Sequence, residues 1–255
     1  MSLWQLVEWL YPENKICPGR MWEDIINLPM DVLDAYDAFR GHFLAYLERY
    51  LGRKLVTFTV LRNPVERTIS HYCHVQRAPE HPFHSEARAL SLADFCTHPR
   101  TRHMVRNYQA GYLACPAAKD PREVAQTMTK DHFATYKLQL ALDPSPDEFP
   151  DRDELYRAAS HRLRSFAAVG ITERLRESLI LIARHFGAPH PPEFGRRNVA
   201  PSRIAVDDHT TRIIRECTEV DHELYADEKR RFDDSVEKLL GSTEPARTQS
   251  SKKRL

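Results

Sequence analysis

Two short apolar stretches, each followed by a helical pattern, predict a mixed α/β fold. Residues 55–61 (LVTFTVL) and 166–171 (FAAVGI) are almost continuously apolar, which is typical of strands buried on both faces of a parallel sheet. Each stretch leads directly into a segment with helical spacing. We therefore expect a three-layer α/β fold, in which helices flank a mostly parallel central sheet.

Helical periodicity accounts for much of the remaining chain. Thr172 and Gly187 are predicted to begin and end the helix after the second strand, as N-cap and C-terminal stop. A weaker helix and a loop rich in Pro and Asp are expected between residues 116 and 165. The other expected helices cover residues 2–10, 30–50 with a break near Gly41, and about 207–240.

The chain is predicted to form one domain over residues 1–240, followed by a disordered polar and basic tail over 241–255. Its 37 Lys and Arg residues nearly balance 36 Asp and Glu residues, so no global field favours nucleic acid or anionic lipid. No run approaches the ~18 apolar residues of a membrane span, and the N-terminus lacks a secretion-signal pattern.

Cysteine usage predicts a reducing compartment. The five cysteines are scattered and never form a CxxC pair, which favours free thiols over a disulfide framework. The sequence therefore predicts a cytoplasmic protein; the alternative is that a truncated start hides an export signal or a membrane anchor. The cysteines are Cys17, Cys73, Cys96, Cys115 and Cys217.

An anion site is predicted where the first strand ends. Arg62 follows the strand, Asn63 suits a helix N-cap, and Pro64 and Glu66 complete a capping-box pattern. The N–H groups and dipole of a helix N-terminus favour a phosphate, and a guanidinium fork matches its oxygens. Ser70, two turns further on, could donate its hydroxyl to the same anion. Pairing of Arg62 with Glu66, and a packing role for Ser70, remain the alternative.

The segment LRNPVERTISHY (61–72) closely resembles the 3′-phosphate-binding motif of sulfotransferases that use 3′-phosphoadenosine 5′-phosphosulfate (PAPS). The closest similarity is to the carbohydrate group that includes heparan-sulfate 2-O-sulfotransferases. This resemblance implies a P-loop-NTPase-like sulfotransferase fold. It also implies that Arg62 and Ser70 hold the 3′-phosphate of the nucleotide.

Other segments resemble the same family in the same order. FRGHF (39–43) is similar to the segment that carries the proposed catalytic base, which implies that role for His42. RRNVAPSR (196–203) resembles a basic loop that folds over the nucleotide, which implies contacts from Arg197, Asn198 and Arg203. The remaining similar segments are NYQAGYLA (107–114), VGITERLRESLILI (169–182) and DHELYADEKRRF (221–232).

One departure from the family concerns the donor's sulfonate. The family begins with a strand and a Gly-rich Lys-Thr loop around the 5′-phosphosulfate, whereas this sequence begins at the point that follows the loop. The first strand is therefore expected to be missing. Because preorganised charge of this kind lowers the barrier by several kcal/mol, or about 3 kcal/mol for one donor, weak or no activity is expected from this polypeptide.

The resemblance implies sulfuryl transfer from PAPS to an acceptor hydroxyl, with a carbohydrate as the partner molecule. A neutral imidazole at His42 would accept the hydroxyl proton, and no metal is required. The alternative is a truncated or degenerate, non-catalytic homologue that binds nucleotide or acts as an interaction protein. The His/Cys run 71–76 does not predict zinc, because its side chains point in different directions on a helix.

Overall fold

A computed structural model describes residues 3–43, 46–114, 120–128, 137–142, 149, 151–188, 191–193 and 204–241. The expected tail, apart from residue 241, lies outside the described residues. In this part of the chain the strands are β1 (Phe58–Leu61) and β2 (Ala168–Ile171).

The helices before β2 are α1 (Leu3–Leu10), α2 (Trp22–Ile25), α3 (Met30–Asp34), α4 (Tyr46–Leu51), α5 (Pro64–Arg77), α6 (His84–Ala89), α7 (Leu92–Thr97), α8 (Tyr108–Ala114), α9 (Pro121–Gln126), α10 (Lys137–Leu142) and α11 (Arg152–Arg164). Those after β2 are α12 (Leu175–His185), α13 (Asp208–Cys217) and α14 (Glu219–Gly241). Short 3₁₀ turns cover Glu13–Lys15, Arg102–Met104 and Thr172–Arg174.

The two predicted strands pair in parallel, as expected. The register runs from Phe58 opposite Ala168 to Leu61 opposite Ile171, so both strands end at the same edge of the sheet. Within the described residues the sheet consists of these two strands. The structure therefore confirms the coarse part of the expected α/β architecture, which is a mixed helical fold around a small parallel sheet.

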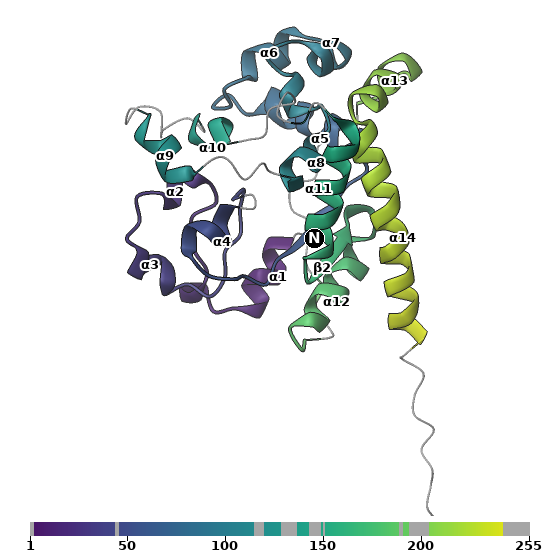
Figure 1. Cartoon of the computed structure of the whole chain (residues 1–255). Coiled ribbons are helices and arrows are strands. Elements are labelled where there is room, and N and C mark those ends of the chain that lie inside the picture. Colours follow the sequence, from purple (N-terminus) through teal and green to yellow (C-terminus); the bar gives the residue numbers. More distant parts are fainter. Residues whose placement is uncertain are drawn as a thin grey trace, which may run out of the picture.

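The long helix α14 runs along one side of the molecule with α11 beside it, and α2, α3 and α4 gather on the opposite side (Figure 1). Apolar side chains of β1, β2, α8, α11 and α14 form a common core. A second core surrounds the fully buried Trp22, whose ring lies 5.7 Å from Phe43 and 5.3 Å from Tyr50 between centroids. The first core supports the end of β1, where the anion site was predicted.

One predicted helix boundary is wrong for a local reason. Thr172 does not cap α12, because Thr172–Arg174 forms a 3₁₀ turn and the helix begins at Leu175. Within the described residues of the stretch 30–50, α3 and α4 are helical and residues 35–43 are not, so the break is present but longer than expected. Gly187 does end its helix region, with a positive φ of 72° that glycine adopts without steric cost.

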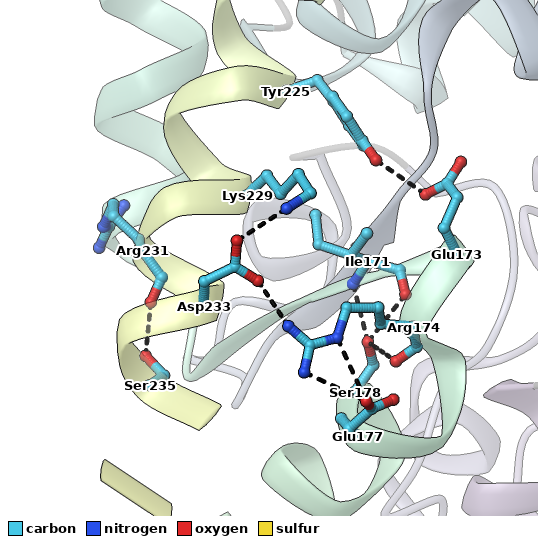
Figure 2. Close-up of polar contacts among 10 residues, drawn as sticks. All are labelled: Ile171, Glu173, Arg174, Glu177, Ser178, Tyr225, Lys229, Arg231, Asp233 and Ser235. Atoms are coloured by element: carbon cyan, nitrogen blue, oxygen red, sulfur yellow. Dashed lines mark hydrogen bonds and ion pairs between the residues drawn. The ribbon is translucent and has the colours of Figure 1, made fainter. Parts of the chain in front are cut away.

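Ser178 and Gly170 hold α12 in close contact with β2. The Ser178 hydroxyl accepts a hydrogen bond from the Ile171 N–H at 2.8 Å and is within 2.9 Å of the Ile171 carbonyl oxygen (Figure 2). A Cβ on Gly170 would lie 2.6 Å from Ser178 Cβ. The glycine in the segment 169–182 is therefore required for close packing of helix on strand.

We expect Gly170→Ala to destabilise the protein by about 1–3 kcal/mol, because the added methyl group overpacks a rigid contact. Urea unfolding followed by circular dichroism measures the change in the free energy of unfolding. Gly52→Asn is the matched control, since Gly52 has a φ of 66° with open space around it and Asn tolerates that conformation. Equal stabilities of the wild type and Gly170→Ala would contradict the packing argument.

Candidate functional site

The backbone of Arg62 is held on both sides by one side chain. The Gln109 amide accepts a hydrogen bond from the Arg62 N–H at 3.0 Å and donates to the Arg62 carbonyl oxygen at 2.9 Å. Gln109 therefore pairs with the peptide at the end of β1 as a neighbouring strand would. This contact brings together the segments 61–72 and 107–114, which resemble the same family.

Asn63 begins α5 as predicted, but the expected capping box forms only in part. Its side-chain oxygen accepts from the N–H groups of Val65 at 3.1 Å and Glu66 at 3.3 Å. The Asn63 N–H donates to Glu173 at 2.9 Å instead of to Glu66. The first N–H groups of α5 are thus already occupied, so a phosphate here would depend on side chains and the helix dipole.

The side chain of Arg62 lies beside Glu66, the pairing considered as the alternative from the sequence. Its guanidinium nitrogen is 3.9 Å from the Glu66 carboxylate, and the two side chains are 35% and 34% exposed. Ser70 lies one turn beyond Glu66 on the same helix face and is half-buried. Arg62 and Ser70 therefore share one side of α5, with a carboxylate between them.

A polar network at the end of β2 holds Glu173 in place (Figure 2). The Tyr225 hydroxyl on α14 donates to Glu173 at 3.0 Å. The guanidinium of the neighbouring Arg174 contacts Asp233 at 2.6 Å and Glu177 at 3.1 Å. Helix α14 is thereby tied to the turn whose carboxylate binds the Asn63 backbone.

The beginnings of α8 and α14 cap each other. The Asp221 carboxylate accepts from the N–H groups of Gln109 at 3.2 Å and Ala110 at 2.7 Å. In return, the Asn107 side-chain oxygen accepts from the Val220 N–H at 3.0 Å. Asn107 adopts a left-handed backbone with a φ of 43°, a conformation that asparagine tolerates better than most residues.

Burial raises the pKa of Asp221 to about 6, although its two backbone hydrogen bonds and the Arg67 charge favour the ionised form. The residue is 1% exposed. Desolvation therefore outweighs the donors around it, and the buried carboxylate titrates close to neutral pH.

His42 lies in a loop whose shape depends on Gly41. A Cβ on Gly41 would come within 2.1 Å of the Arg20 carbonyl oxygen, and the His42 N–H donates to that oxygen at 2.8 Å. The His42 ring meets the Tyr112 ring edge-on, with centroids 6.3 Å apart. Desolvation and the Arg67 charge lower the pKa of His42, so the imidazole is neutral at neutral pH.

Helix α8 connects the surroundings of His42 with those of Arg62. Gln109 binds the Arg62 peptide, and Tyr112, three residues later, contacts His42. The cavity of about 510 Å³ that adjoins this region is lined by Tyr112, by residues on both sides of His42, and by the beginning of β1. This volume is in the range of small-molecule sites.

Two site residues were not predicted from the sequence. The Arg67 guanidinium lies 3.9 Å from the Tyr108 ring centroid and is close enough to affect His42. The His71 ring stacks near the Tyr108 ring with centroids 6.4 Å apart, and its buried Nε2 atom has no hydrogen-bond partner among the described residues. Burial, followed by the charge of Arg67 and nearby histidines, lowers the pKa of His71 well below its usual value. The signal in the sequence that connects Arg67 with His71 is their i, i+4 spacing on α5.

Arg197, Asn198 and Arg203 lie outside the described residues, so their expected contacts stay predictions. Among the residues that are described, no group of three or more His, Cys, Asp or Glu side chains is arranged to hold a metal ion.

Comparison with curated proteins finds sulfotransferases. The chain is 26% identical over 215 residues to heparan-sulfate 6-O-sulfotransferase 1 of Homo sapiens, a match that covers 80% of this chain and 48% of the human protein. The proteins of the same name from Cricetulus griseus and Mus musculus match at the same identity. The chain spans about half the length of these curated relatives. No family model matches the chain, and no solved structure matches it significantly.

These matches support the predicted sulfotransferase similarity and correct its detail. The relatives are 6-O-sulfotransferases rather than members of the expected 2-O group. The motif 61–72 predicted the similarity to sulfotransferases, which the relatives support. It could not identify the acceptor position, which is set elsewhere in such proteins.

The predicted cytoplasmic location is wrong. The heparan-sulfate sulfotransferases that the chain resembles are Golgi-lumenal, membrane-anchored proteins, which conflicts with it. The four described cysteines are indeed free thiols, so the error lies in inferring a compartment from them. Across the described residues, no helix combines the length and apolar character needed to cross a bilayer.

Asp221 is expected to make stability depend on pH. Its folded pKa of about 6 exceeds the unfolded value of about 3.9, so the group stabilises the fold at low pH and this contribution is lost as pH rises through 6. When the pH is lowered from 7 to 4, the free energy of unfolding of the wild type should rise by about 2–3 kcal/mol relative to that of Asp221→Asn. Urea titrations of both proteins at each pH measure this, and parallel pH profiles would contradict the shifted pKa.

Proposed function

We propose that this protein is a PAPS-dependent sulfotransferase that transfers a sulfuryl group to a hydroxyl of a heparan-sulfate-type saccharide. One observation carries the proposal: three segments that resemble the family, 61–72, 107–114 and 169–182, meet at the end of β1 through Gln109 and Glu173. The similarity to heparan-sulfate 6-O-sulfotransferases supports the reaction and the acceptor class. We include in this proposal the three-layer, P-loop-NTPase-like arrangement around β1 and β2.

The hydrogen-bond donors at Arg62 and Ser70 suit the 3′-phosphate of the nucleotide. The guanidinium is partly exposed, and Ser70 offers a hydroxyl on the same side of α5. Glu66 opposes an anion at this place, so its carboxylate must turn away when phosphate binds. Arg197, Asn198 and Arg203 are proposed to close over the nucleotide as the sequence resemblance implies.

His42 is proposed as the general base. PAPS supplies the activated sulfuryl group when bound, and the protein must position the acceptor hydroxyl and remove its proton. Because desolvation and Arg67 lower the pKa of His42, its imidazole is unprotonated at neutral pH and able to accept that proton. Arg67, whose charge acts on His42, is proposed to stabilise the negative charge that develops on oxygen during transfer.

Arg62→Ala is expected to weaken binding of adenosine 3′,5′-bisphosphate by about 1.5–3 kcal/mol, the range for a charged hydrogen bond. Glu66→Gln should strengthen it by up to about fivefold, because the competing surface ion pair is worth at most about 1 kcal/mol. Isothermal titration calorimetry measures both. Equal affinities for the wild type and Arg62→Ala would reject the phosphate role of Arg62.

In a protein that also carries the family's Gly-rich Lys-Thr loop ahead of residue 1, His42→Ala is expected to lower the rate of sulfuryl transfer to a heparan-type oligosaccharide by about 10²–10⁴-fold and to leave the affinity for the bisphosphate unchanged. The acidic limb of the wild-type rate profile should lie below pH 6.5, the ordinary pKa of histidine, because the His42 pKa is lowered. Transfer of radiolabelled sulfate measures the rate. Binding of the nucleotide without any transfer by the wild type would instead indicate a non-catalytic binding protein.

A further inference from the structure

The cross-capping of α8 and α14 continues into the backbone of Arg62. Gln109 and Asp221 are 112 residues apart in the sequence, yet the Asp221 carboxylate fixes the Gln109 N–H. The Gln109 side chain then binds the N–H and the carbonyl oxygen of Arg62. A buried carboxylate on α14 is therefore connected to the end of β1 in two steps: one hydrogen bond to the Gln109 backbone, and a pair of hydrogen bonds between the Gln109 side chain and the Arg62 peptide.

Each contact in this series restrains the next. Asp221 is almost fully buried, so its oxygens have no water to exchange for the N–H groups of α8. A glutamine side chain has several rotamers, and its two hydrogen bonds to a single peptide select one of them. Because the guanidinium of Arg62 extends from that peptide, a displacement of α8 changes where the guanidinium lies.

We propose that Asp221 is a positioning residue for the nucleotide site, which acts through Gln109 to set the Arg62 side chain toward the 3′-phosphate. This inference rests on the proposed function. It assigns to α14, which is far from Arg62 in the sequence, a role in selecting nucleotides that carry a 3′-phosphate. Asp221 does not itself contact the nucleotide.

The alternative is that Asp221 only stabilises the fold. A purely structural role would reduce the affinity for every nucleotide equally, or for none. Positioning of Arg62, in contrast, affects only the contact with the 3′-phosphate. The ratio of the dissociation constants for adenosine 5′-monophosphate and adenosine 3′,5′-bisphosphate therefore separates the two roles.

The experiment is isothermal titration calorimetry of the full chain with both nucleotides at a temperature at which circular dichroism shows each variant folded. Asp221→Asn and Gln109→Ala should each lower the preference for the bisphosphate by about tenfold. The double variant should lose no more than either single variant, because both act on the same peptide. Asp120→Asn is the control, since Asp120 caps α9 through the Arg122 N–H at 2.8 Å and should leave the preference unchanged.

Several outcomes would overturn the inference. Asp221 would be a purely structural residue, and the proposed function would stand, if Asp221→Asn kept the preference for the bisphosphate. The same holds if this variant lost affinity equally for both nucleotides. If Asp221→Asn does not fold, an unchanged preference in Gln109→Ala overturns the inference by itself. A wild type with no preference for the bisphosphate would remove the proposed function and the inference together.

Discussion

The pairing of the Gln109 amide with the Arg62 peptide is the contact on which the candidate site depends. Strand β1 is only four residues long, and its hydrogen-bonded partner β2 ends opposite Leu61. Beyond that point the described part of the chain offers no strand to pair with the backbone of Arg62, and the Gln109 side chain pairs with it instead. Glu173 does the same for the next residue, Asn63. The chain can therefore leave the sheet in a fixed direction before α5 begins.

The second half of the candidate site is an arrangement of rings and charge around α8. Tyr108 and Tyr112 stack with centroids 5.9 Å apart, and each contacts a histidine, His71 and His42 respectively. Arg67 lies against the face of Tyr108. Burial, and secondly the positive charge of Arg67, lowers the pKa of both His42 and His71. Both imidazoles are therefore held in the neutral form, which is the state that a proton acceptor requires.

Local sequence rules predicted the elements of the site but not all of their contacts. Asn63 and Pro64 were assigned correctly to the start of α5, because capping depends on residues close in the chain. The partner of the Asn63 N–H was predicted incorrectly. The carboxylate of Glu173, 110 residues away in the sequence, accepts this hydrogen bond in place of Glu66. Spacing along a chain contains no information about such a competitor. For the same reason Asp221 was not singled out as a site residue.

The sequence by itself determined two parallel strands, the helix that follows Arg62 and a similarity to sulfotransferases, because these depend on short-range hydrophobic patterns and on one contiguous motif. The expected burial of the strands on both faces is wrong, because only Leu61 of β1 and Gly170 and Ile171 of β2 are buried. The tertiary structure decided which residues surround that motif. The side chains of Gln109 and Glu173 bind its backbone, and Asp221 binds the backbone of α8 at Gln109, so that each satisfies backbone donors or acceptors that need partners. Whether a neighbouring polar group or a distant one satisfies a backbone donor is settled only when the chain is packed.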